Sequence, residues 1–215
     1  MYATISADIV SSTTLSKEET INLKQRIESL LQRLEKKYPG LWGRMIKGDY
    51  IECVTSEVSS IFRIALIIKS HIKSFVVNKN ENTKKFQTYG VRMAIGIGEM
   101  RIVDKEQNIM DGEAIYLSGR AIEKMEKTNK GTLTIEINNQ DLSAPLRIIA
   151  LLTDALINDT TPKQSEVLYY KLLGKKEKEI AENMNIKQSV VNEHASLAKW
   201  YCIQEALFYF KNQKY

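Results

Sequence analysis

Two aspartates, Asp8 and Asp49, are placed where the chain could bind a cation. Asp8 stands near the end of a predicted strand that begins at Tyr2, and Asp49 follows Gly48 in a predicted hairpin turn. Carboxylate oxygens are preferred ligands of hard divalent cations. The small residues after Ile9 form a turn before a predicted helix, where backbone N–H groups can meet an anionic oxygen. The two stretches predict a metal and phosphate site, although Asp8 could instead cap the turn and Asp49 could be an ordinary turn residue.

The elements that must position these aspartates follow from the spacing of apolar residues and from turn signals. The first helix is predicted to begin at Ser16, whose hydroxyl can cap it, and to stop at Pro39 and Gly40. The polar segments 78–85 and 104–111 are predicted to be loops. The predicted strands are 2–9, 41–46, 50–55, 89–97 and 132–137, and the later predicted helices are 58–77 and 112–127.

The order of these elements predicts an α+β fold. The first six match a ferredoxin-like split βαβ sheet with helices on one face. A boundary at residues 138–141 divides the chain into two predicted domains, 1–140 and 141–215, and the second contains only helices. Its predicted helices are 145–157, with Pro145 in the first turn, 163–173, 176–183 and a long helix from Gln188 to about Asn212.

Composition limits the classes of protein to which the chain could belong. It has 215 residues, 43% of them hydrophobic, which suffices for one large or two small domains. It contains no apolar run long enough to span a bilayer, and Met1 leads directly into a strand, so we expect neither a membrane partner nor a signal peptide. Cys53 and Cys202 stand in apolar segments and are predicted to be small buried side chains rather than a disulfide.

The net charge of +5 is concentrated toward the C-terminus. Residues 160–215 contain nine lysines and six glutamates and neither arginine nor aspartate. This balance tolerates a nucleic-acid partner without requiring one.

Three segments follow one another in the chain: residues 8–13 (Asp-Ile-Val-Ser-Ser-Thr), residues 48–49 (Gly-Asp) and residues 112–120 (Gly-Glu-Ala-Ile-Tyr-Leu-Ser-Gly-Arg). Together they resemble the catalytic domain of class III nucleotidyl cyclases, over roughly residues 2–137. In that family two aspartates and one backbone carbonyl hold two divalent cations. The resemblance therefore implies that Asp8, Asp49 and the carbonyl of Ile9 bind Mg²⁺ or Mn²⁺, which can neutralise a triphosphate during attack by a ribose hydroxyl.

The same resemblance implies nucleotide contacts. Arg120 would stabilise charge in the transition state, although it could instead be a surface residue paired with Glu113 or Glu123. The turn that would surround the phosphates consists of Val10, Ser11, Ser12 and Thr13.

Other positions depart from the pattern of the cyclases. Tyr116 stands where the family has the asparagine that orients the ribose, and Met45 stands where it has a base-reading lysine. The second base-reading position falls near Ile109. A tyrosine hydroxyl cannot copy the paired donor and acceptor of an asparagine amide. We therefore expect a cyclase-like domain that binds a cation and a nucleotide with doubtful cyclase activity.

Residues 161–168 and 178–186 resemble a helix-turn-helix of the LuxR and sigma-region-4 types. The helix from Gln188 would then be the recognition helix, whose N-terminal part enters the major groove of DNA. The same sequence could instead form only a small helical bundle, because an apolar stripe continues along this helix to Tyr209. The residues expected at DNA are Gln188, Ser189, Asn192 and Ser196 in the groove, and Lys187 and Lys199 at phosphates.

Over nearly its whole length the chain resembles the SatD-like bacterial proteins, which implies a cytoplasmic regulatory protein. Two functional hypotheses follow. The first is a transcriptional regulator in which a degenerate cyclase-like domain senses a cation or a nucleotide and the C-terminal helices bind DNA. The second is a metal-dependent enzyme that cyclises or hydrolyses a nucleoside triphosphate, with the C-terminal helices serving dimerisation. Class III cyclases build their sites between subunits, so both hypotheses imply a homodimer.

Overall fold

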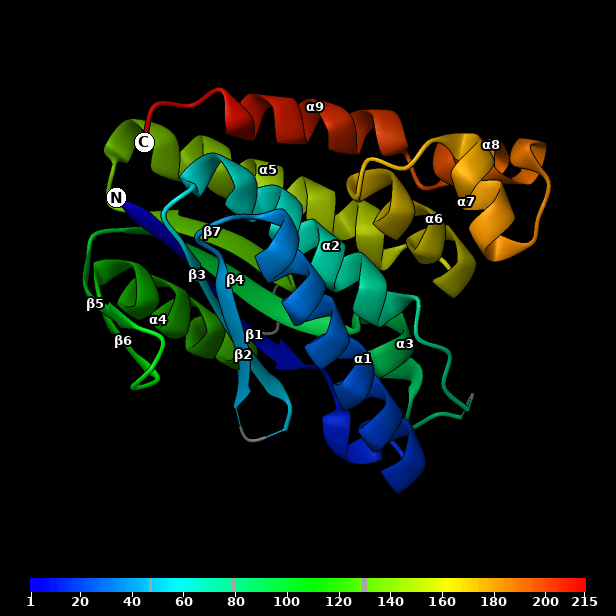
Figure 1. The fold of residues 1–215 in the computed structure, drawn as a ribbon, viewed down its shortest axis with the longest axis horizontal. Helices are drawn as coiled ribbons and strands as arrows, with labels where there is room; N and C mark the ends of the chain where they lie inside the picture. The colour runs from blue at the N-terminus through cyan, green and yellow to red at the C-terminus, as the bar shows by residue number, and fades with distance from the viewer. Residues whose placement is uncertain (47, 79, 129–130) are drawn as a thin grey trace.

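The computed structural model describes residues 1–46, 48–78, 80–128 and 131–215. A five-stranded sheet in the order β2-β3-β1-β4-β7 forms its centre, and β5 and β6 form a separate ribbon (Figure 1). The strands are β1 (Tyr2–Ile9), β2 (Trp42–Ile46), β3 (Tyr50–Thr55), β4 (Val91–Gly98), β5 (Met100–Asp104), β6 (Ile109–Gly112) and β7 (Leu133–Ile137). The α-helices are α1 (Lys17–Lys37), α2 (Ile61–Lys73), α3 (Lys84–Tyr89), α4 (Glu113–Thr128), α5 (Gln140–Asn158), α6 (Pro162–Leu172), α7 (Glu177–Met184), α8 (Gln188–Leu197) and α9 (Trp200–Lys211).

Strand β1 lies at the centre of the sheet because both of its edges are paired. It runs antiparallel to β3, with Asp8 opposite Tyr50, and antiparallel to β4, with Asp8 opposite Arg92. With the short α3 added between α2 and β4, the segment β1-α1-β2-β3-α2-β4 gives the strand order β2-β3-β1-β4, which agrees with the predicted split βαβ arrangement. Strand β7 extends this sheet by parallel pairing with β4. The molecule is therefore of the predicted α+β class.

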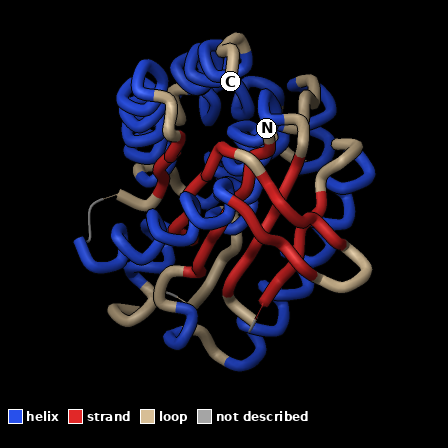
Figure 2. The backbone as a smooth tube through the Cα atoms, turned by 90° about the vertical axis from the view of Figure 1, so that its left-hand side faces the viewer, coloured by secondary structure: helices blue, strands red, loops and turns tan. Residues whose placement is uncertain are grey.

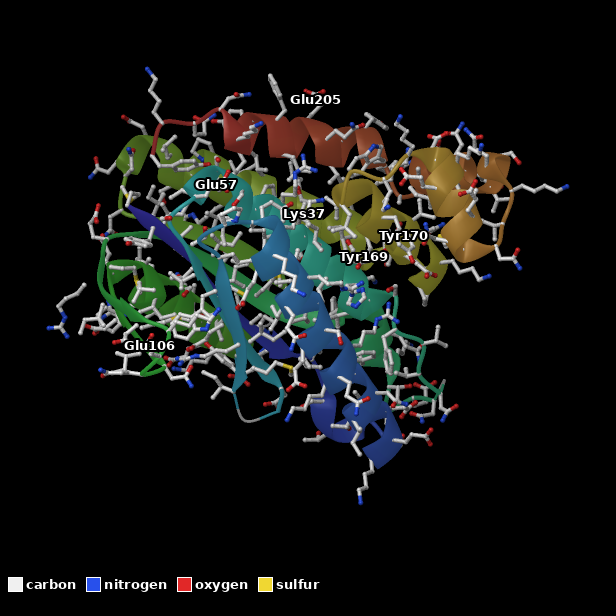
Figure 3. All side chains as sticks on the ribbon, in the orientation of Figure 1. Lys37, Glu57, Glu106, Tyr169, Tyr170 and Glu205 are labelled. Atoms are coloured by element: carbon white, nitrogen blue, oxygen red, sulfur yellow. The ribbon has the colours of Figure 1, made fainter. Side chains whose placement is uncertain are left out.

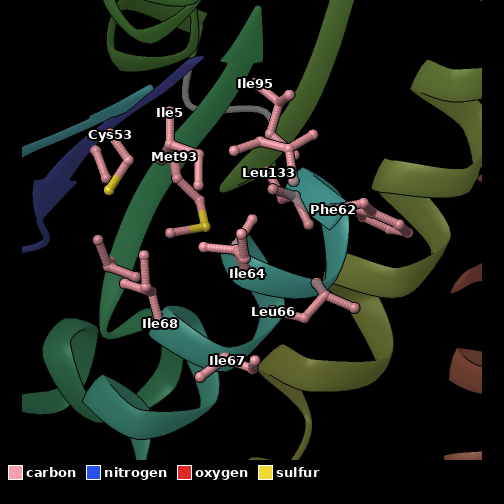
Figure 4. Packing of buried hydrophobic residues seen from close by; sticks show 14 of the residues in the cluster. Ile5, Cys53, Phe62, Ile64, Leu66, Ile67, Ile68, Met93, Ile95 and Leu133 are labelled. Atoms are coloured by element: carbon pink, nitrogen blue, oxygen red, sulfur yellow. The ribbon is translucent and has the colours of Figure 1, made fainter. Parts of the chain in front are cut away.

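The residues of β1 alternate between the two faces of the sheet. Ala3, Ile5 and Ala7 are fully buried in the main hydrophobic cluster, on the face that α1 and α2 cover. Figure 4 shows Ile64 of α2 beside Met93 of β4 in this cluster. Burying such a side chain contributes about 1.5–3 kcal/mol, so this face fixes the position of β1.

Helix α4 covers the opposite face, whereas α1 and α2, the helices of the predicted split βαβ unit, share one face as predicted. Thr4 and Ser6 of β1 point to Ser118 of α4, with hydroxyl oxygens 3.0 and 2.8 Å from that of Ser118. A side chain at Gly96 would bring its Cβ to 2.0 Å from the carbonyl oxygen of Ala114. Only glycine permits this close approach, which holds α4 against the sheet.

Several predicted boundaries between residues 58 and 112 are wrong. Helix α2 ends at Lys73 rather than near Val77, and the polar segment predicted as a loop leads into α3. Ile109 lies in β6, which pairs with β5, and not in a loop. The β5–β6 pairing is a local hairpin whose residues lie outside the hydrophobic clusters. The anchoring of α3 depends on contacts with α2 that periodicity does not reveal.

The C-terminal helices share the main hydrophobic cluster with the sheet. Asn139 caps α5 by accepting from the N–H groups of Asp141 and Leu142, so Pro145 lies inside the helix and not in its first turn as predicted. Leu146 of α5 is fully buried in the cluster that contains the sheet residues. The predicted boundary between residues 140 and 141 thus falls at the start of a helix whose buried face packs on the sheet (Figure 2).

Helix α6 joins the C-terminal helices to α1 and α2. Lys37 at the end of α1 donates to the carbonyl of Leu173, and Tyr169 of α6 stacks on His71 of α2 with ring centroids 4.5 Å apart. Figure 3 labels Lys37 and Tyr169 in this region. A second, smaller hydrophobic cluster joins α6, α7 and α8 and consists of Val167, Ile180, Ala181, Val191 and Ala195.

The long helix predicted from Gln188 to about Asn212 is interrupted. Helix α8 ends at Leu197, and α9 begins at Trp200. Lys199 between them has a φ of 54°, in the left-handed region. The apolar stripe continues across this break because both helices bury residues against the rest of the protein, so periodicity alone concealed the turn.

Both cysteines are free thiols, and Cys53 is fully buried as predicted, whereas Cys202 is only half-buried. In the part of the chain that the structure describes, none of the helices is both long and apolar enough to cross a membrane.

Candidate functional site

The carboxylate of Asp8 lies at the end of the central strand, on the face that α4 covers. Its Oδ2 atom is 3.6 Å from Nη1 of Arg92, which is also 4.0 Å from Oε1 of Glu126 on α4. Burial raises the pKa of Asp8, the charge of Asp49 raises this pKa further, and Arg92 opposes the rise. The electrostatic environment of Asp8 therefore disfavours its negative charge, and a bound cation would relieve this.

The β2–β3 hairpin brings Asp49 to the turn that follows β1. The N–H of Ile9 donates to the backbone carbonyl of Asp49 at 3.1 Å, and the hydroxyl of Ser12 donates to Oδ2 of Asp49 at 3.0 Å. Among the described residues, Oδ1 of Asp49 has no hydrogen-bond partner. Lys47 of the predicted turn lies outside the described residues. Asp8, Ile9 and Asp49 thus lie at one end of the sheet, although they are distant in sequence.

The two carboxylates face neighbouring hollows. Asp8 and Ser11 line a pocket of about 390 Å³, and Asp49 and Ser12 line a second pocket of about 290 Å³ together with Ile9. The chain segment from Ile9 to Ser12 lies between them. Among the described residues the two pockets have no lining residue in common, so a cation bound by both carboxylates would have to lie at the segment that separates them.

The turn predicted to surround phosphates has three unpaired amides. The N–H of Val10 donates to the carbonyl of Gly90 at 3.1 Å, so Val10 cannot offer its amide to a ligand as predicted. Ser11 has a φ of 55°, and a 3₁₀ turn (Ser12–Thr14) follows it. The amides of Ser11, Ser12 and Thr13 have no backbone acceptor among the described residues. Such a run of unpaired N–H groups can bind an anionic oxygen.

A cation at this site would have few protein ligands. Within the described ranges, no group of three or more His, Cys, Asp or Glu side chains is placed to hold a metal ion. Asp8, Asp49 and the carbonyl of Ile9 would therefore leave several positions for water or for a ligand. That donor set fits Mg²⁺ or Mn²⁺ with a bound phosphate, because Mg²⁺ usually binds through one or two carboxylates, waters and phosphate oxygens.

The residues predicted at the ribose, the base and the transition state lie elsewhere. Tyr116 is 52% exposed, and its hydroxyl donates to Asp111. Arg120 is exposed one turn further along α4. Glu126, the residue of α4 beside Asp8, follows Tyr116 by ten positions, about 15 Å along a helix. Tyr116 and Arg120 line neither of the two pockets.

The two base-reading positions also line neither pocket. Met45 is half-buried against the main hydrophobic cluster, and Ile109 is exposed on β6.

The sequence alone did not single out three cationic residues of the pocket that holds Asp8. Lys84 and Lys85 belong to α3, and Arg92 belongs to β4. Because side chains alternate along a strand, Arg92 points away from the face on which Val91 and Met93 are buried. The sequence of β4 could therefore have indicated its position. Lys84 and Lys85 gave no such signal, since their segment had been predicted to be a loop.

The residues predicted at DNA all lie on the outside of the molecule. They lie on α8 or directly beside it. The opposite side of α8 packs against α6 and α7 through Val191 and Ala195. The turn before α8 is tight, because Asn185 has a φ of 51° and the N–H of Ile186 donates to the carbonyl of Ala181 at 3.0 Å. The exposed residues are Lys187, Gln188, Ser189, Asn192, Ser196 and Lys199.

No protein-family model matches this chain, and no curated protein matches it. Among solved structures, a bacterial light-regulated adenylyl cyclase is similar over 62% of this chain and 42% of its own, with 18% identity and a TM-score of 0.44. A second structure of a bacterial light-regulated adenylyl cyclase is similar over 62% of this chain and 74% of its own, with 17% identity and a TM-score of 0.42. These similarities are too distant to transfer an activity, a substrate or a site residue. The resemblance to SatD-like proteins stays a prediction.

Proposed function

We propose that this protein binds a divalent cation together with a nucleotide at the end of β1, and that this domain acts as a sensor. One observation carries the proposal. The hairpin places Asp49 beside the turn after β1, and its charge, together with burial, raises the pKa of Asp8. Two carboxylates held in this way repel each other, and a shared cation removes the repulsion. The three motifs that resemble class III nucleotidyl cyclases support the same site.

In this proposal each group of the site has a separate role. Asp8, Oδ1 of Asp49 and the carbonyl of Ile9 bind Mg²⁺ or Mn²⁺. The unpaired amides of Ser11, Ser12 and Thr13 donate to phosphate oxygens of the nucleotide, and the cation neutralises the same phosphates. Ligand binding is thus coupled to the position of the β2–β3 hairpin.

Cyclase activity is expected to be poor. Tyr116 cannot replace an asparagine amide at the ribose, and its hydroxyl is engaged by Asp111. In a homodimer, α4 of a second copy could approach the site and supply Arg120. Even then the ribose and base contacts would be missing.

Titration calorimetry with Mn²⁺ tests the cation site. We expect binding to the intact protein and its loss in Asp49→Asn, because one of two carboxylate ligands is removed. Asp141→Asn, an exposed aspartate at the start of α5, removes the same charge outside the site and should leave binding unchanged. Equal affinity of Asp49→Asn and the unsubstituted protein would contradict the proposal.

Incubation with each ribonucleoside triphosphate and Mn²⁺, followed by mass spectrometry, tests the catalytic alternative. We expect bound nucleotide with little conversion. Rapid formation of a cyclic nucleotide that disappears in Asp49→Asn would favour the metal-dependent enzyme instead.

A second candidate function is DNA binding by α8, which would make the protein a transcriptional regulator in the bacterial cytoplasm. The observation in its favour is that all six residues predicted at DNA are exposed around one short helix. Glu193, exposed on the same helix, would weaken contact with phosphates. Selection of bound fragments from a random DNA pool would test it. Recovery of no common sequence, with no loss of affinity as salt rises, would exclude this function.

A further inference from the structure

The pocket that contains Asp8 has a basic wall on the side away from the Asp49 hairpin. Lys84 and Lys85 line it from α3, and Arg92 lines it from β4. Arg92 is engaged by Asp8 at 3.6 Å and by Glu126 at 4.0 Å. Both lysines are exposed, and no carboxylate of the described residues lies within 4.0 Å of either ammonium group. The lysines are therefore the cations that a ligand in this pocket can reach.

Helix α3, which carries these lysines, is held in place by two buried lysines of α2. It has only six residues, too few to be stable alone. Lys73 of α2 donates to the carbonyl of Thr88 at 2.6 Å, and Lys69 donates to the carbonyls of Tyr89 and Val91 at 3.3 and 3.1 Å. Two buried ammonium groups thus satisfy carbonyls at the C-terminal end of α3, where cations are favourable.

The donors that this wall offers to a ligand are its lysines. Thr88 of α3 and Thr132 line the same pocket, but the hydroxyl of Thr88 donates to the carbonyl of Lys84 at 3.0 Å and that of Thr132 donates to Asp154 at 2.7 Å. Burial lowers the pKa of Lys73 to about 8, whereas Lys84 and Lys85 extend into solvent. The two pairs of lysines therefore have different tasks: the buried pair positions α3, and the exposed pair faces the pocket.

We infer that this wall is an anion subsite that binds a polyphosphate chain through Lys84 and Lys85. A polyphosphate fits better than a single small anion, because two adjacent lysines in a pocket of about 390 Å³ leave room for more than one phosphate group. The inference deepens the proposed function, since the pocket also contains Asp8, and it rests on that function for the identity of the ligand as a nucleoside polyphosphate. A cation at Asp8 would contact the same chain from the opposite side.

Titration calorimetry with inorganic tripolyphosphate tests the subsite, first in EDTA and then with Mn²⁺. In the double variant Lys84→Gln/Lys85→Gln we expect the dissociation constant in EDTA to rise about tenfold or more, because charge-assisted hydrogen bonds to the phosphates are lost. The matched control is Lys211→Gln/Lys214→Gln, which removes two exposed positive charges at the C-terminus. This control should change the dissociation constant less than about twofold, because these lysines act on the phosphates only through screened long-range attraction.

The outcomes separate this inference from the proposed cation site. In EDTA, Asp49→Asn should bind tripolyphosphate as well as the unsubstituted protein does. No Mn²⁺ binding by the intact protein, together with lysine-dependent tripolyphosphate binding, would contradict the cation site and support the subsite. Mn²⁺ binding together with equal tripolyphosphate affinity in the lysine and control variants would overturn the subsite alone. No detectable binding of tripolyphosphate by the intact protein would overturn it as well.

Discussion

The end of the sheet that holds Asp8 and Asp49 and the exposed side of α8 are built in different ways. At the sheet end, groups far apart in sequence meet: Ser12 bonds to Asp49 37 positions later, and Arg92 lies beside Asp8. On and beside α8, the six predicted DNA contacts all lie between Lys187 and Lys199. Among the described residues, the side chain of Gln188 is hydrogen-bonded only to Glu177 of the neighbouring α7. A site of the first kind depends on tertiary geometry, whereas one of the second kind depends only on a helix and its exposure.

The two regions are also anchored differently. Below the pocket that contains Asp8, Lys69 and Asp154 form an ion pair at 3.1 Å with exposed fractions of 0 and 2%. Asp154 also accepts from the N–H and hydroxyl of Thr132, which lines the pocket. Helix α8 rests on a small apolar cluster that includes Ile180 and Val191. The stability of the sheet end should thus depend on its buried ion pair, whereas the stability of α8 should depend on the apolar side chains beneath it.

The largest expected effect is that of Asp154→Ala. This change leaves the ammonium group of Lys69 buried without its counter-ion, which should lower the free energy of unfolding by about 3–5 kcal/mol in urea titrations. The double variant Lys69→Met/Asp154→Leu should recover part of the loss, because it removes both buried charges but leaves the N–H of Thr132 and the carbonyl of Val91 without these partners. A cost of Asp154→Ala below about 1 kcal/mol would show that the pair does not anchor this end of the sheet.

Ile180→Ala addresses the anchoring of α8. Removing a fully buried isoleucine side chain should destabilise the cluster by about 2–5 kcal/mol. Because the cluster is small and separate from the main one, we expect hydrogen exchange to increase in α7 and α8 while Mn²⁺ binding at Asp8 and Asp49 persists. Simultaneous loss of Mn²⁺ binding would mean that the two regions unfold as one unit.

Asn192→Ala tests whether the exposed side of α8 recognises DNA sequence. If Asn192 contacts an adenine edge, its loss should weaken binding to a selected site by about 1–3 kcal/mol and leave binding to unrelated DNA unchanged. Fluorescence anisotropy with both DNAs measures the difference. Lys187→Gln is the comparison, because loss of a phosphate contact should weaken both complexes alike and reduce the salt dependence.

The smallest expected effect concerns Asp8→Asn. The pKa of Asp8 in the folded protein is raised above its ordinary value, so the folded state binds this proton more tightly than the unfolded state does. Stability therefore falls as pH rises through the window between the two pKa values, and the ionised carboxylate is destabilising above it.

Without a metal, Asp8→Asn should consequently be more stable than the intact protein at pH 7, by less than about 1 kcal/mol because the group is partly solvated. The difference should vanish below the unfolded-state pKa. Thermal unfolding from pH 3 to pH 7, with Asp141→Asn as control, measures it. Lower stability of Asp8→Asn at pH 7 would mean that the Arg92 pair outweighs burial and repulsion.

Local sequence was sufficient where a few neighbouring residues decide the structure. Ser16 and Glu19 form the capping box that starts α1, and Thr161 with Gln164 starts α6 in the same way. The strand predicted over residues 2–9 is β1, with Asp8 near its end as expected. The sequence likewise indicated that the turn after Ile9 and the hairpin at Asp49 belong together, and their hydrogen bonds agree with this.

Only the tertiary structure decided which charged groups surround Asp8 and which helices share a core. Lys84 and Lys85 reach the pocket because two lysines of α2 hold the carbonyls at the end of α3, a contact between distant segments that no local pattern encodes. The break at Lys199 was hidden because packing, not spacing, makes the stripe on α8 and α9 continuous. Periodicity reports which side of an element is buried, but the partner that buries it is selected by the packing of the whole chain.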